Sequence, residues 1–341
     1  MAKRVSIKEV AQEAGVSIAT VSYVINNKTE QSISKETIDR VYEAVDKLNY
    51  VPNLSARILA NNKSNLVGVV IPQTEPNKEF MFSNPFYSEF LSSFEYTARK
   101  KGYHVLISGT NPDENYIEVA KKRNLDGIIV LGTYPKDTLE ELKNSGIPTV
   151  IIDSYVESYH FNTVETDDCY GGYLATKYLL EKGHRKIAIV TGSFTEKGVN
   201  QERLRGYKDA LLEYGIAVNN KYICSGTVDF DFGLEIAKTV TELKDEITAV
   251  FCTADIIAMG LMNGLYKAGV KVPEELSIIG FDNTFTSKIT VPALTTVNQN
   301  IALKGERAAK MIIGIIEEKL KGKQEYIIPI EVVERESVRE V

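Results

Sequence analysis

The chain lacks the short motifs that mark common classes of enzyme. Its 341 residues contain no GxGxxG or Walker A phosphate loop, no HExxH zinc motif and no GxSxG nucleophile elbow. The three histidines, His104, His160 and His184, lie far apart, and His184 falls in a Gly-His-Arg-Lys turn before an apolar run. Structural roles therefore fit the histidines better than catalytic ones, and we expect no enzyme activity, no catalytic residue and no cofactor.

Cysteine is scarce, and long apolar runs are missing. The chain has three scattered cysteines, Cys169, Cys224 and Cys252. Their odd number favours free, buried thiols in a reducing compartment, and their spacing is not that of metal ligands, so we expect no metal site. The beginning, MAKRVSIKEV, has no apolar signal-peptide core, and no stretch approaches about 18 consecutive apolar residues. We expect a cytoplasmic protein that does not contact a membrane.

Charge is unevenly divided along the chain. The net charge is −6, yet the residues through Lys63 carry nine Lys or Arg against seven Asp or Glu, a net of +2 that leaves −8 for the rest. With 43% hydrophobic residues, a chain of this length forms two or three domains. A mildly basic head on an acidic body suits a small polyanion-binding module joined to a larger domain.

Residues 5–27 carry two short helical patterns that meet at Gly15. Gly15 provides the turn that ends the first helix, and Ser17 is placed to cap the second. The predicted buried positions are Ile7, Val10, Ala11 and Ala14 in the first helix and Val21, Val24 and Ile25 in the second. The other face of the second helix carries Ile18, Ala19, Ser22 and Tyr23. This pattern predicts a helix-turn-helix, with an ordinary helical hairpin as the alternative.

A third helix and a linker follow. Ser34 is a predicted N-cap, Asn49 a predicted left-handed C-cap and Pro52 the stop. The core positions of this helix are predicted at Ile38, Val41, Tyr42, Val45 and Leu48. The polar segment beyond it, residues 53–64, is too short to form a stable helix alone.

From Leu66 onward, Val- and Ile-rich runs alternate with helical patterns. These runs lie at residues 66–71, 104–108, 127–131, 149–153, 187–191, 222–226, 248–252 and 276–281. Such runs predict parallel sheets buried on both faces, in two successive open α/β halves. A helix near residues 300–320 and the IIPIEVVER tail are expected to join the halves. A ligand cleft is expected between them, outside the carboxyl ends of the strands.

This order of elements resembles the LacI/GalR family of bacterial transcription regulators. The resemblance rests on IKEVAQEAGVSIATVSYVINN and ISKETIDRVYEAVDKLNYVPNLSARIL in the head, and on SNPFY, EKGHRKIAIVTG, ERLRGY, CTADIIAMG, SIIGFDN and PALTTVNQN in the body. It implies a helix-turn-helix domain (1–52), a hinge (53–64) and a two-lobed, periplasmic-binding-protein-like body with two parallel sheets (65–341). The first lobe is expected at about 65–160 and 294–324, and the second at about 161–293 and 325–341.

The resemblance also implies roles for residues of the head. The second helix would lie in the DNA major groove, with Ile18, Ala19 and Tyr23 reading base edges. The family usually has Arg where this chain has Tyr23, so a bidentate contact to guanine is lost. Leu59 would be wedged into the minor groove from the hinge, and Ala60 follows it where a basic residue is common. The phosphates would be held by Ser17, Thr20, Ser22 and Asn26.

In the body, the resemblance implies an effector site. Arg203 and Asp282 would hold the polar groups of the effector, and Phe86 and Phe230 would form apolar or stacking walls. This set suits a sugar, whose ring presents hydroxyl edges and apolar faces. The predicted function is a homodimeric repressor of carbohydrate-utilisation genes that binds a palindromic operator of double-stranded DNA and responds to a small sugar.

Two alternatives stay open. A transport-type sugar-binding protein fits residues 65–341 but leaves the head without a purpose. A regulator that senses a non-sugar metabolite, such as a purine, fits the whole chain.

Overall fold

The computed structural model describes residues 5–25, 33–51, 63–72, 81–110, 116–132, 136–154, 160–194 and 198–341. The chain divides into two compact units, Met1–Ser64 and Asn65–Val341, which we call the head and the body and describe separately. The division coincides with the residue at which the sequence predicts the body to begin.

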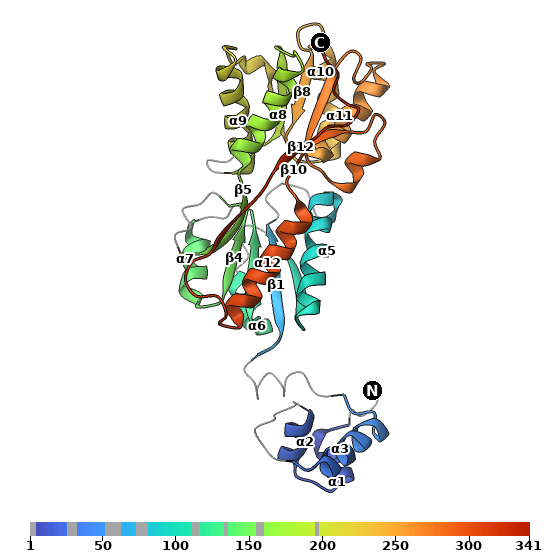
Figure 1. The fold of residues 1–341 in the computed structure, drawn as a ribbon, viewed down its shortest axis with the longest axis vertical. Helices are drawn as coiled ribbons and strands as arrows, with labels where there is room; N and C mark the ends of the chain where they lie inside the picture. Colours follow the sequence, from blue (N-terminus) through green and yellow to red (C-terminus); the bar gives the residue numbers. More distant parts are fainter. Residues whose placement is uncertain are drawn as a thin grey trace. The chain divides into compact units, whose positions relative to one another are not determined.

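The head is a small helical unit with α1 (Ile7–Ala14), α2 (Ile18–Ile25) and α3 (Lys35–Lys47) (Figure 1). A capping box starts α1, in which Ser6 and Glu9 each accept a hydrogen bond from the other's backbone amide. Gly15 ends the helix with φ 65°, as predicted, because this left-handed conformation favours a residue without Cβ. The buried core of the head consists of Val10, Ala11, Ala14, Val21, Val24, Val41, Ala44 and Tyr50.

The core face of α3 differs at one position from the prediction. Tyr42 is 43% exposed, and Ala44, which was not predicted, is buried in its place. The hydroxyl of Tyr42 donates to the carbonyl of Val24 at 3.5 Å, so the side chain lies along the edge of the core with its polar end toward the surface.

The body contains two six-stranded sheets, one in each lobe (Figure 1). The first has the order β11 (Glu325–Ile328), β5 (Asn162–Thr166), β4 (Thr149–Ile152), β3 (Gly127–Leu131), β1 (Leu66–Pro72), β2 (His104–Thr110). The second has the order β12 (Glu331–Val333), β10 (Thr295–Asn298), β9 (Ser277–Asp282), β8 (Ala249–Cys252), β6 (Ile187–Gly192), β7 (Ile223–Gly226). All neighbouring strands are parallel except the antiparallel pair β10 and β12.

Helices cover both faces of each sheet, which is why the central strands are apolar on both sides. In the first lobe, α5 (Pro85–Lys100) and α12 (Ile301–Ile316) pack on one face, and α6 (Tyr116–Arg123) and α7 (Lys136–Ser145) on the other. In the second lobe, α8 (Asp168–Glu181) and α9 (Val199–Glu213) face α10 (Phe230–Glu242) and α11 (Asp255–Lys267) across the sheet. Three 3-10 helices complete the described elements, at Met81–Ser83, Asn220–Tyr222 and Phe285–Lys288.

The chain passes between the lobes three times, a few residues later than the sequence predicts. The expected crossings at 160/161, 293/294 and 324/325 are too early, because β5 and β11 belong to the first sheet and β10 to the second. The crossings follow Thr166, Asn298 and Ile328. The early boundaries arose because β5 (NTVET) and β10 (TTVN) are short and rich in threonine and lack the long apolar signature of the central strands.

Among the described residues, no helix combines the length and the apolar character needed to cross a membrane.

Candidate DNA-reading face and effector site

The outer face of α2 presents the residues that the sequence assigns to DNA. Ser17, Ile18 and Ala19 are exposed, Ile18 by 48%, while Thr20, Ser22 and Tyr23 are partly exposed. The buried side of the same helix carries Val21 and Val24, so the two faces are distinct. Ile18 is therefore not needed for the core of the head, and its half-exposed side chain is available to an apolar group such as a thymine methyl.

The start of α2 is held by hydroxyl groups. The Oγ of Ser17 accepts the backbone amide of Thr20 at 3.0 Å, which is the predicted N-cap. The two hydroxyls also share a hydrogen bond at 2.8 Å. This arrangement fixes the first turn of the helix, the part that a helix-turn-helix brings to the bases. Asn26 and Leu59, both assigned to DNA contact, lie outside the described residues.

Arg203 is placed by the close approach of α8 and α9. A Cβ on Gly172 would lie 2.1 Å from the carbonyl oxygen of Arg203, and one on Gly206 would lie 1.9 Å from that of Cys169. The two helix backbones touch at these two points, so only glycine fits there. This contact sets the base of the Arg203 side chain beside the first turn of α8, where Asp168 lies.

The Arg203 side chain is almost wholly buried and already bonded within the protein. It is 6% exposed, and its Nε donates to Oδ1 of Asp168 at 2.7 Å. Its Nη1 donates to the carbonyl of Thr253 at 2.6 Å, and the Phe281 ring lies 3.7 Å from the guanidinium carbon. Asp168 is fully buried, so the two residues form a desolvated ion pair.

Asp282 ends β9 in the second lobe. It is buried, and its backbone has φ 124°, a conformation that non-glycine residues rarely adopt. Its Oδ1 accepts Nε2 of Gln299 at 2.5 Å. Burial raises the pKa of the Asp282 carboxyl to about 6, although the positive charge of Arg203 acts in the opposite direction.

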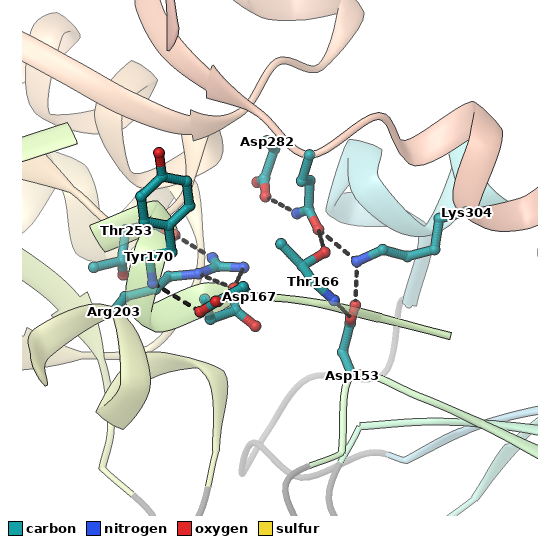
Figure 2. A network of polar contacts seen from close by, with 10 residues as sticks. Asp153, Thr166, Asp167, Tyr170, Arg203, Thr253, Asp282 and Lys304 are labelled. Atoms are coloured by element: carbon teal, nitrogen blue, oxygen red, sulfur yellow. Dashed lines mark hydrogen bonds and ion pairs between the residues drawn. The ribbon is translucent and has the colours of Figure 1, made fainter. Parts of the chain in front are cut away.

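Lys304, on α12 of the first lobe, completes a chain of contacts to Asp282. Its ammonium is fully buried and donates to Oδ2 of Asp153 at 2.5 Å and to Oε1 of Gln299 at 2.6 Å. Asp153 follows β4, and its Oδ1 accepts the amide of Thr166 at 3.2 Å. Burial raises the pKa of Asp153, and Lys304 opposes that rise. The network joins residues of both lobes at the ends of their strands (Figure 2).

Three of the four residues predicted for the effector site lie around this network. Arg203 and Asp282 influence each other electrostatically, and the Phe86 ring centroid lies 5.6 Å from the Lys304 ammonium. Phe230, the first residue of α10, is 37% exposed and is not part of the network.

Sequence reasoning missed Asp153, Asp168, Gln299 and Lys304. Two signals were present. Asp153 directly follows an apolar strand, and Lys304 interrupts the apolar stripe of Ile301, Ala308 and Ile312 on α12.

A second buried carboxyl, that of Asp255, lies next to Ala254 at the start of α11. Asp255 accepts hydrogen bonds from the hydroxyl of Thr296 at 2.6 Å and from the amide of Thr284 at 2.8 Å. Burial raises its pKa to about 8, with the nearby Asp282 adding to the rise. These bonds tie α11 to β10 and to the loop after β9, which is a structural role. Among the described residues, no group of His, Cys, Asp or Glu side chains is arranged to hold a metal ion.

A helix-turn-helix head with a separate outer face, joined to a two-lobed α/β body, defines a DNA-binding regulator with a periplasmic-binding-protein-like body. Comparison with known proteins identifies the family. Residues 6–53 match the model of bacterial regulatory proteins of the lacI family, and residues 176–338 match that of a periplasmic binding protein-like domain. The chain is 35% identical over 342 residues to the HTH-type transcriptional repressor PurR of Vibrio vulnificus (strain CMCP6), covering 98% of this chain and 99% of that protein. The chain belongs to the lacI family, a family of transcription regulators rather than enzymes.

Another relative and two solved structures match this chain over nearly its whole length. PurR of Pasteurella multocida (strain Pm70) is 33% identical over 98% of both chains. The transcriptional regulator CelR–cellobiose complex is 26% identical with a TM-score of 0.72, covering 98% of this chain and all of that one. The Lac repressor dimer bound to operator, at 23% identity, has a TM-score of 0.83 over 99% of this chain and all of that one, which establishes the shared fold.

Proposed function

We propose that the protein is a transcriptional repressor that binds a palindromic operator as a homodimer and is controlled by a purine-type effector bound between the lobes of the body. The observation that carries this proposal is the similarity to PurR repressors, which extends over 98% of the chain and so includes both the head and the body. It favours the second of the two effector classes weighed from the sequence, the purine over the sugar.

The dimer follows from the small size of the head. One α2 helix offers only a few base contacts, whereas two heads related by a twofold axis read two half-sites and double the contacts. The body offers surface for a second copy, because large apolar side chains are exposed in both lobes. They include Tyr96 and Ile107 in the first lobe and Phe285, Ile289 and Val291 in the second. The solved Lac repressor structure, a dimer on its operator, has the same fold.

The polar network has chemistry that suits a nucleobase. A purine presents ring N–H donors, acceptor nitrogens and a flat apolar face. The Asp282 carboxylate accepts from an N–H group, and Phe86 offers an aromatic ring for stacking. The two buried cations, Arg203 and Lys304, are each bonded to a carboxylate of the protein, so the site does not present an uncompensated positive charge to a phosphate group. An uncharged base therefore fits better than a phosphorylated ligand.

A sugar is the second candidate. Regulators of the same fold have been solved with cellobiose, at 26% identity, and with ribose, in a lacI-family regulator of Enterococcus faecium at 29% identity over 81% of this chain. Hydroxyl groups bind the same Asp and Arg side chains, so the polar residues alone do not separate a sugar from a base.

Control of DNA binding follows from the three crossings between the lobes. An effector that contacts Phe86 in one lobe and Arg203 in the other changes the relative stability of two lobe arrangements, and only one of them suits the spacing of two heads on DNA. Effector binding therefore changes the affinity of the protein for its operator. The affinity rises if the effector stabilises the lobe arrangement that suits DNA, and falls if it stabilises the other one.

The DNA-binding part of the proposal is tested by selection from a pool of random duplexes. We expect the full chain to enrich a palindrome, and residues 65–341 alone, which form a separate unit, to enrich nothing. Enrichment by the body alone, or no consensus with the full chain, contradicts it.

The effector is tested by calorimetric titration with hypoxanthine, guanine, ribose and cellobiose, with inosine monophosphate as the phosphorylated control. We expect binding of a base and not of the nucleotide. Tight binding of ribose or cellobiose with no response to either base would favour the sugar.

A further inference from the structure

Lys304 is an unexpected residue at its position. It is fully buried on the apolar face of α12, between Ile301 and Ala308, where a methionine of similar length fits the same space. Replacing a buried ion pair by apolar side chains of similar volume is often neutral or stabilising, because the charges lose their hydration on folding. Stability alone therefore gives no reason for a lysine here.

The contacts of Lys304 set the direction of the Gln299 amide. An ammonium group has only donors, so the Gln299 atom that faces Lys304 at 2.6 Å is the oxygen Oε1. The NH₂ end of the same amide is then turned to Oδ1 of Asp282, 2.5 Å away. The hydroxyl of Thr166 also donates to Oε1 of Gln299, at the longer distance of 3.3 Å. With an apolar residue at position 304, Oε1 would keep this neutral donor but lose its short, charged one.

We propose that Lys304 is a positioning residue of the effector site, which through the amide of Gln299 holds the Asp282 carboxylate in the orientation that the effector meets. The role of Asp282 as an effector ligand rests on the proposed function, whereas the link from Lys304 through Gln299 to Asp282 does not. Asp153 fixes the other end of the link, because it binds the Lys304 ammonium and the amide of Thr166 together.

The ligand class follows from the same link. Gln299 donates to Asp282 and cannot accept from it, so the carboxylate keeps its acceptor character and is matched by a ligand that donates N–H or O–H. Removing the fixed donor lets the Asp282 carboxyl take up a proton more readily, and a protonated carboxyl is a poorer acceptor for such a ligand.

The test is a titration of Asp282 that needs no ligand. Carbon-13 in the aspartate carboxyls reports each pKa, and Asp282→Asn assigns the signal. The charged or titratable groups that act on Asp282 include Arg203 on α9, Asp255 on α11 and Lys304 on α12. We expect Lys304→Met to raise the pKa of Asp282 above its wild-type value, and Lys304→Arg to restore part of the difference. Lys310→Met, on the exposed side of the same helix, is the matched control and should leave it unchanged.

A double-mutant cycle separates positioning from a simple charge effect. If Lys304 acts through Gln299, Lys304→Met shifts the Asp282 pKa much less in a Gln299→Met background than in the wild type. Equal shifts in the two backgrounds overturn the proposal, because the lysine would then act through space alone. Lys304→Met combined with Asp153→Asn provides a second variant without an unpaired buried carboxylate, should the single variant fold poorly.

Hypoxanthine affinity supplies the functional readout. We expect about tenfold weaker binding in Lys304→Met, roughly 1.4 kcal/mol, and unchanged binding in Lys310→Met. If the wild type binds neither bases nor sugars, the proposed function fails, while the titration still decides the positioning role. If hypoxanthine binds the wild type and Lys304→Met equally, the positioning role fails and the proposed function stands.

Discussion

The head and the body carry their functional groups in opposite ways. On α2 the residues assigned to DNA are exposed or half-exposed, and a separate buried face holds the helix in place. In the body, the residues assigned to the effector include Arg203 and Asp282, which are buried and bonded to other charged or polar groups. A substitution on α2 therefore changes recognition with little effect on folding, whereas a substitution in the network changes recognition and stability together.

The largest expected effect breaks the Arg203–Asp168 pair. Arg203→Met removes the arginine that is ion-paired with the fully buried Asp168, and we expect the body to lose roughly 3–5 kcal/mol of stability. Asp168→Asn added to Arg203→Met should recover most of the loss. Urea unfolding followed by circular dichroism measures both variants. Both should also lose the effector response. A single variant as stable as the wild type would contradict the importance of the buried pair.

The next effect concerns the hinge. A leucine wedged between base pairs costs a few kcal/mol of unstacking, and the bent duplex offsets this by meeting more protein. We expect Leu59→Ala to weaken operator binding by a similar amount and to reduce bending, while salt-dependent binding to unrelated DNA persists. Energy transfer between dyes at the two duplex ends measures the bend. Equal bending and affinity in both proteins would show that Leu59 is an ordinary linker residue.

The pH dependence of stability should differ between head and body. The folded pKa of Asp255, about 8, lies above its ordinary 3.8, so the folded body binds more protons and loses stability as pH rises toward 8. One such proton changes stability by at most about 1.4 kcal/mol per pH unit. In the head, the hydrogen bond to Glu13 raises the pKa of Lys47, and this shift changes the stability of the head only at alkaline pH.

Asp255→Asn isolates this contribution. Unfolding at pH 6.5 and 8 should show a smaller decrease for the variant than for the wild type, since the asparagine does not titrate. Identical decreases in the two proteins would mean that Asp255 is already ionised in the folded state at the lower pH.

A recognition change without a stability change is the smallest expected effect. Tyr23→Arg introduces a fork that reads guanine, and it should shift base discrimination at one position of each half-site by about 1–3 kcal/mol. Because Tyr23 lies on the partly exposed side of α2, the unfolding midpoint of the head should stay the same. Selection from random duplexes gives the new consensus, and an unchanged consensus would remove Tyr23 from the base-reading set.

Local patterns predicted much of the fold. Gly15, Ser17 and the apolar stripes of α1 and α2 act within a few residues of each other, so the sequence shows them directly. The central strands were clear because burial on both faces demands continuous apolar runs. The short strands β5 and β10 were not clear from the sequence. They lie at the crossings between the lobes, where their threonines hydrogen-bond to residues distant in the sequence, as Thr296 does to Asp255.

The effector network was only partly predictable. Arg203 and Asp282 entered through the family resemblance, but their partners Asp168 and Gln299 depend on which helices and crossings meet in three dimensions. Lys304 is 151 residues from Asp153, and no local pattern links them. The visible signs were a lysine within an apolar helix stripe and an aspartate directly after an apolar strand, and neither names the other as its partner.

Coupling between body and head is the central claim, and fluorescence anisotropy of a labelled, selected operator tests it most directly. The protein is titrated onto the operator with and without hypoxanthine, and then with ribose and cellobiose. We expect one effector class to change operator affinity at least about tenfold in the wild type, roughly 1.4 kcal/mol of coupling, and to have no effect on Arg203→Met/Asp168→Asn. Operator affinity that is the same with and without every one of these compounds would contradict the account.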